Sequence, residues 1–125
     1  MISKVEISSI VSLIKDFDYE MLDDAEWERF RNCDPTDEKQ MLEIFNQTIV
    51  SSYETMDVQS QVLIRDGLSF ILSSTGFDYK SILNMVEMPF EPIDDPRLFF
   101  STLWYALFKS RFQSTDASYG NLGQP

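Results

Sequence analysis

The sequence predicts an all-α fold: a single-domain, compact helical bundle of about five to six helices, with an apolar C-terminal helix at its centre. Apolar residues mostly recur three and four positions apart instead of alternating, as on the buried face of a helix. Only four glycines and five prolines interrupt the 125 residues, and 43% of the chain is hydrophobic. We expect the domain to cover residues 1–112, with a flexible polar tail over residues 113–125.

The first two expected helices are marked by acidic residues at their starts. Ser3 and Glu6 have the spacing of a capping box for a helix over residues 4–16. Its apolar face is formed by Ile7, Ile10, Val11 and Ile14. Asp23 and Glu26 repeat the same signal for a short, mostly charged helix.

A longer helical region is expected to begin at residue 35. Asp34 is the expected N-cap and Pro35 the first helical residue, because proline is favoured at that position. Whether residues 36–74 form one rod or two pieces stays open, although Asp57 could cap a second helix.

Residues 62–72 allow two interpretations. Asp66-Gly67 between two apolar runs is a recognised hairpin signal. A helix is favoured because its neighbours look helical and because five apolar residues share one helical face. These residues are Val58, Val62, Leu68, Ile71 and Leu72. Gly67 would then cost about 1 kcal/mol relative to alanine.

The last part of the chain predicts a helix end, a short helix, a connector and a final helix. Gly76 suits a left-handed helix end, and Asp78 is the expected cap of a helix reaching residue 87. The prolines within residues 88–93 favour an extended connector. Asp95 and Pro96 then open the last helix, whose apolar residues extend to Phe112 and cover most of its circumference.

Several kinds of chemistry are excluded by composition. The chain has no histidine, so it lacks a Ser/His or Cys/His nucleophile pair and a histidine-bearing zinc site. Cys33 is the single cysteine, which allows no intrachain disulfide. Helix capping explains the carboxylate pairs at residues 23–24 and 94–95. We therefore expect no enzyme activity, no cofactor and no metal.

A calcium loop is a sharper alternative for the acidic residues. Asp16, Asp18 and Glu20 match the first three ligand positions of an EF-hand. Met21 stands where the loop needs glycine, and Trp27 stands where the bidentate glutamate belongs. The pattern therefore fails as a specific calcium site.

The acidic charge is concentrated in one segment. Residues 16–38 contain ten acidic residues against Arg29 and Arg31, so they hold most of the net charge of −11. Aromatic side chains, which anchor many interfaces, are interleaved with them. This segment predicts a binding surface for a basic protein. Its candidate contacts are Asp16, Asp18, Tyr19, Glu20, Asp23, Asp24, Glu26, Trp27, Glu28 and Phe30.

A short, acidic, helical chain with an acidic and aromatic segment resembles the bacterial immunity proteins of contact-dependent growth inhibition (CDI) systems. The resemblance lies in size, charge and this segment, without a diagnostic motif. It implies a protein that binds a basic toxin domain, often a nuclease, and blocks its active site or substrate groove. No signal peptide and no apolar run long enough for a membrane span are seen, so we expect a cytoplasmic protein that binds neither membranes nor nucleic acid directly.

Two other functions fit the same features. A phage-type DNA mimic, such as an anti-CRISPR inhibitor, would also carry spaced carboxylates. A helical adaptor subunit would instead use its apolar last helix as an interface, and would then expose Phe99, Trp104 and Phe108. The identity of the partner and the oligomeric state are left open by the sequence.

Overall fold

The computed structural model describes residues 4–18, 22–74, 76–86, 88–89 and 93–113. Over these residues the chain forms seven α-helices and one short 3-10 helix, without a strand, and the all-α prediction is confirmed. The helices outnumber the five to six expected because two of them, α4 (Ile49–Thr55) and α6 (Lys80–Leu83), are short pieces. The expected tail lies almost entirely outside the described residues.

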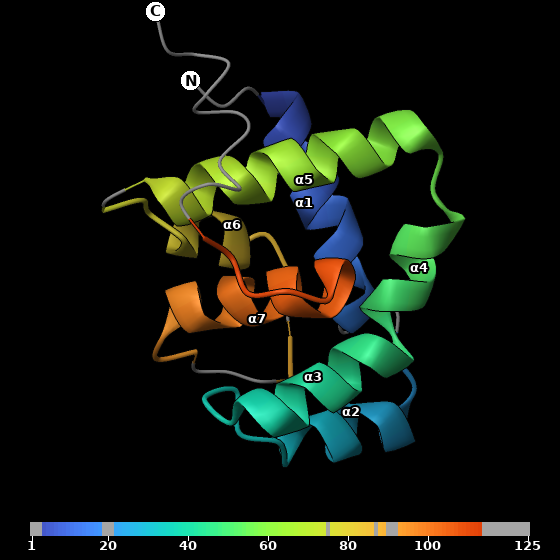
Figure 1. Ribbon diagram of the computed structural model, residues 1–125. Helices are drawn as coiled ribbons and strands as arrows, with labels where there is room; N and C mark the ends of the chain where they lie inside the picture. The colour runs from blue at the N-terminus through green and yellow to red at the C-terminus, as the bar shows by residue number, and fades with distance from the viewer. Residues whose placement is uncertain (1–3, 19–21, 75, 87, 90–92, 114–125) are drawn as a thin grey trace, which may run out of the picture.

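The most extensive helix contact joins α1 (Lys4–Ile14) to α5 (Val58–Ser73), which cross in the upper part of Figure 1. Gly67 lies at this crossing and is buried. A Cβ atom at Gly67 would lie 2.9 Å from Ile10 Cδ1 and 3.2 Å from Glu6 Cβ. Glycine therefore allows α1 and α5 to approach closely. The hairpin alternative is wrong, because residues 62–72 lie within the single helix α5.

The other large contact joins α3 (Glu38–Gln47) to α7 (Pro96–Phe108). In Figure 1, α7 lies between α5 above and α3 below. Aromatic rings connect these layers: Phe45 on α3 packs edge-on against Phe99 on α7 at 5.4 Å, and tilted against Phe17 at 5.8 Å. The core is thus shared among α1, α3, α5 and α7. The special central role expected for the last helix stays a prediction.

Aspartate caps begin four of the helices. The side chains of Asp23, Asp37, Asp57 and Asp95 each accept a hydrogen bond from the backbone N–H three residues later. Such bonds satisfy donors that the first helical turn leaves without partners. Three of these caps were predicted from the sequence, and Pro96 follows the last of them as expected.

Two other predicted caps are wrong. Asp34 does not begin α3; its carboxylate accepts hydrogen bonds from the backbone and side chain of Thr36, which closes a turn. Asp37 is the true cap, three residues later. Asp78 does not cap α6 with its side chain, and α6 ends at Leu83, short of residue 87.

Residues 36–74 form three helices instead of one rod or two pieces. The first break is at Thr48, whose φ of −128° and ψ of −81° are not helical. Its hydroxyl donates to the Ile44 carbonyl oxygen at 2.7 Å. A side chain that bonds to the preceding turn competes with the helical hydrogen bonds. The second break precedes Asp57, as expected.

The final helix is shorter than its apolar pattern suggests. It ends at Phe108, and Lys109 adopts a left-handed conformation with φ of 60°. This turn sends residues 109–113, which we call the C-terminal strap, back along α7 (Figure 1). Phe112 is therefore not part of the helix but packs edge-on against Trp104 at 5.0 Å.

Candidate partner-binding surface

The helix α2 (Asp24–Arg31) carries most of the predicted contact residues and lies at the edge of the domain, beside α3 (Figure 1). It has no extensive contact with any other helix in the described part of the chain. Phe30 is its one buried residue, and the Phe30 ring packs edge-on against Phe17 at 5.8 Å. Arg29 adds a hydrogen bond to the Gln47 side chain on α3. The remaining side chains of α2 are exposed or half-buried.

The start of α2 is fixed by a capping box. The Asp23 carboxylate accepts from the Glu26 N–H at 2.7 Å, and the Glu26 carboxylate accepts from the Asp23 N–H at 3.1 Å. Acidic groups are favoured at this end by the helix dipole. The two carboxylates therefore have a structural role, while they still add negative charge to this end of the helix.

The other predicted contacts divide into exposed residues and residues that hold the fold. Asp24 and Glu28 are exposed, and Glu28 forms a surface ion pair with Arg31 at 3.4 Å. Trp27 is half-buried. Phe30 is only 1% exposed, so it anchors α2 in the core. Phe30 is therefore not accessible for the contact with a partner that the sequence predicts. We define the α2 acidic face as Asp24, Trp27 and Glu28, which helical spacing places on one side of α2.

The acidic residues before α2 lie on another element. Asp16 belongs to the 3-10 helix η1 (Lys15–Phe17), and its carboxylate accepts a hydrogen bond from the Ser52 hydroxyl on α4. Asp18 ends η1 and is half-buried. The candidates Tyr19 and Glu20 lie outside the described residues. Asp16 thus joins η1 to α4 as well as adding charge.

Two basic side chains outside α2 make contacts that hold the ends of helices in place. The Arg65 guanidinium lies over the rings of Trp104 and Phe108, at 5.1 and 5.6 Å. Lys109 donates to the Ala106 carbonyl oxygen, which satisfies an acceptor at the end of α7. The cations that do lie on α2 are Arg29 and Arg31, in its last turn.

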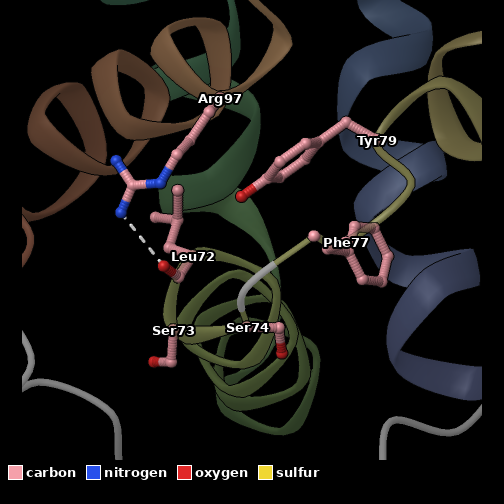
Figure 2. Close-up of a pocket in the computed structure, with 7 residues that line it drawn as sticks. Leu72, Ser73, Ser74, Phe77, Tyr79 and Arg97 are labelled. Atoms are coloured by element: carbon pink, nitrogen blue, oxygen red, sulfur yellow. Dashed lines mark hydrogen bonds between the residues drawn. The ribbon is translucent and has the colours of Figure 1, made fainter.

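A shallow cavity of about 380 Å³ lies between the end of α5 and the start of α7 (Figure 2). Its polar groups are committed to the last turn of α5. Arg97 donates to the Leu72 carbonyl oxygen at 3.0 Å, and Tyr79 donates to the Ile71 carbonyl oxygen at 2.9 Å. These bonds satisfy carbonyl groups that a helix end leaves without partners. We therefore infer that the residues around the cavity have a structural role and connect the end of α5 to the start of α7.

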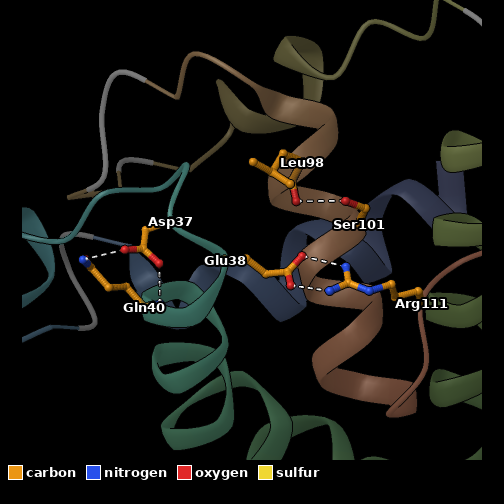
Figure 3. Close-up of polar contacts among 6 residues, drawn as sticks. All are labelled: Asp37, Glu38, Gln40, Leu98, Ser101 and Arg111. Carbon is orange, nitrogen blue, oxygen red and sulfur yellow. Dashed lines mark hydrogen bonds and ion pairs between the residues drawn. The ribbon is translucent and has the colours of Figure 1, made fainter.

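The C-terminal strap is held by an ion pair that the sequence did not reveal. Arg111 donates two parallel hydrogen bonds to the Glu38 carboxylate, at 2.6 and 2.8 Å (Figure 3). The Arg111 guanidinium also lies 4.9 Å from the centre of the Tyr105 ring. The two charged residues are 73 positions apart, so no local pattern could have indicated the pair.

This ion pair predicts that the attachment of the C-terminal strap to α3 depends on pH. The hydrogen bonds from Arg111 hold the pKa of Glu38 below its ordinary value of 4.5. The pKa of Glu38 is lower in the native state than in the unfolded state, so the contribution of the ion pair to stability is fully present when the pH is above the ordinary pKa. This contribution is lost as the pH falls through the native-state pKa. We expect the fluorescence of Trp104, which packs on Phe112, to change in this acidic range.

A matched pair of proteins checks the prediction. Trp27→Phe leaves Trp104 as the single tryptophan, and its acid titration is compared with that of a second protein that also carries Glu38→Gln. The acidic fluorescence change should be absent when Gln replaces Glu38. An identical change in both proteins would contradict the assignment.

Among the described residues, no group of three or more Cys, Asp or Glu side chains is placed to hold a metal ion. None of the helices there is both long and apolar enough to cross a membrane. Phe99 and Trp104 are buried and Phe108 is half-buried, so the last helix does not expose the three rings that the adaptor hypothesis requires.

No protein-family model, curated protein or solved structure matches this chain. The α2 acidic face therefore has to be interpreted from its own geometry and charge.

Proposed function

We propose that this protein is an immunity protein of the CDI kind. It binds a cognate basic toxin domain, which we take to be a nuclease, and neutralises it by covering its active site or substrate groove. The inhibition is stoichiometric, without enzyme activity, and takes place in the cytoplasm. The observation that carries the proposal is the placement of α2, a helix whose first part is acidic and whose one buried residue, Phe30, holds it at the edge of the domain.

The charge of the α2 acidic face suits a nuclease partner. A nuclease binds phosphates through lysine and arginine side chains. Carboxylates placed against the same side chains attract the enzyme at long range and exclude its substrate. Trp27 is half-buried and lies among these carboxylates, so it can supply apolar contact area that charge alone does not give.

The test needs carboxylates that do not hold the fold. Asp24 and Glu28 qualify because both are exposed and neither caps a helix, and the double variant Asp24→Asn and Glu28→Gln removes two charges. Glu43→Gln with Asp78→Asn is the matched control, since these exposed acids lie on α3 and before α6. Both pairs change the net charge equally.

We expect the wild-type protein to protect cells that express a basic nuclease toxin domain, found by co-expressing the protein with a panel of such domains. Binding kinetics with that domain should show about a tenfold slower association for the α2 pair, and a much smaller change for the control pair. Equal slowing by both pairs would show that only net charge matters. Protection from none of the toxin domains would contradict the proposed function.

A DNA mimic would give a different result in the same assays. It would compete with duplex DNA for several unrelated nucleic-acid-binding proteins, whereas an immunity protein discriminates its own toxin domain from close relatives. Broad competition would therefore favour the mimic over the immunity protein.

A further inference from the structure

The start of α5 carries an apolar face that other helices leave uncovered. Val58 is 74% exposed and Val62 is 48% exposed. The sequence predicts one helical face for these valines and for Leu68, Ile71 and Leu72, but only the last three residues are buried. The two valines lie four residues apart, so they are neighbours on one side of α5.

The same side of α5 is covered further along the helix. At helical spacing, Val58 and Val62 are followed by Arg65, Ser69 and Leu72. Arg65 lies against Trp104 and Phe108 of α7, and both Ser69 and Leu72 are buried. This side of α5 therefore extends, at Val58 and Val62, beyond the part of the bundle that covers it.

The cover is missing because α7 ends too early. The two helices are antiparallel: Arg97 at the start of α7 contacts Leu72, whereas Trp104 and Phe108 near its end contact Arg65. A longer α7 would continue toward Val62. Instead Lys109 reverses the chain, and the strap packs back on Trp104 and Tyr105.

The charge around the two valines indicates what could cover them. The sequence has no lysine or arginine between Lys39 and Arg65. Glu54 and Asp57, four residues and one residue before Val58, are both exposed. A second copy of this chain would bring like charges together at this face, whereas a partner with apolar side chains flanked by lysine or arginine would be complementary in both respects.

We propose that Val58 and Val62, flanked by Glu54 and Asp57, form a second docking surface for the basic protein partner. This face supplies an apolar contact, and the α2 acidic face supplies attraction. The inference rests on the proposed function for the identity of the partner. Its test uses probes that do not depend on a toxin.

The probes are two synthetic helical peptides with the same number of lysines. One has a leucine stripe flanked by lysines, and the other has serine in place of each leucine. We expect the Leu/Lys peptide to bind the protein about tenfold more tightly, because leucine and valine side chains leave water on contact. Amide chemical shifts measured by NMR should change most over residues 54–62.

The variants separate the apolar contact from general attraction. Val58→Ser with Val62→Ser should remove the preference for the Leu/Lys peptide and leave binding of the Ser/Lys peptide unchanged. Met85→Ser is the control, because Met85 is an apolar residue elsewhere on the surface whose exposure (56%) lies between those of the two valines. A preference that survives in the valine variant, or shift changes centred away from residues 54–62, would overturn the proposal.

Two other ways of covering the valines are tested with the protein alone: by residues 114–125 of the same chain, or by a second copy of the chain. Removal of residues 114–125 should leave the NMR chemical shifts of the Val58 and Val62 methyl groups unchanged. A change in these shifts would show that the tail covers the valines and would overturn the proposal. A dimer that is detected by light scattering and dissociates in the Val58→Ser variant would show that a second copy of the chain covers the valines. That result would also overturn the proposal. Neither result would affect the toxin-protection assay, so failure of this inference and failure of the proposed function are distinguishable.

Discussion

A Gly67→Leu variant is expected to lose about 3 kcal/mol or more of its free energy of unfolding, because overpacking a close helix crossing forces the backbone apart. Even the first side-chain atom would lie 2.9 Å from Ile10 Cδ1 and 3.2 Å from Glu6 Cβ. Ile10 is fully buried, so its side chain would have to repack inside the core, and the rest of the leucine side chain would have to fit between α1 and α5 as well. The change therefore separates α1 from α5, which form the most extensive helix contact of the fold.

Chemical denaturation followed by circular dichroism measures this loss. Gln59→Leu is the matched control, since it adds the same side chain at an exposed position of the same helix. We expect the control to unfold at nearly the wild-type denaturant concentration. A Gly67→Leu protein as stable as the control would show that the helices do not cross as closely as described.

A Phe30→Ala variant is expected to detach α2 from the domain. Phe30 is the single buried residue of α2, and removal of a buried phenylalanine costs about 3–5 kcal/mol. The loss in the free energy of unfolding of the whole domain should lie at the lower end of this range. The reason is that α2 has no extensive contact with another helix and can unfold locally while the rest of the domain stays folded. The amides of α2 should then exchange with deuterium much faster than those of α5.

Trp27→Ala is the control, because it removes a larger side chain that is only half-buried on the same helix. Its α2 amides should stay protected. Under the proposed function, Phe30→Ala should also weaken toxin binding, although Phe30 itself touches no partner. Unchanged α2 exchange in the Phe30→Ala protein would show that other contacts hold the helix.

Part of the candidate surface could be predicted from the sequence. The concentration of acids over residues 16–38 and the helix start at Asp23 are local features, and the structure shows a capped acidic helix there. The sequence could not distinguish Trp27 from Phe30 as an exposed anchor. Both are aromatic and lie three residues apart, and only the position of Phe17 decides that Phe30 is the buried one.

The sequence by itself determined the all-α class and the starts of α2, α5 and α7. An aspartate cap bonds to a backbone group only three residues away, so the residues that decide a helix start are adjacent in the chain. The same local reasoning failed at Asp34, where a competing turn to Thr36 uses the carboxylate.

Only the tertiary structure decided which apolar residues are covered. Val58 and Val62 have the spacing of core residues, yet they are exposed because α7 ends at Phe108. The Glu38–Arg111 pair and the close approach at Gly67 likewise join segments that are distant in sequence. Periodicity shows that a helix has an apolar face, but burial of that face depends on where its neighbours begin and end.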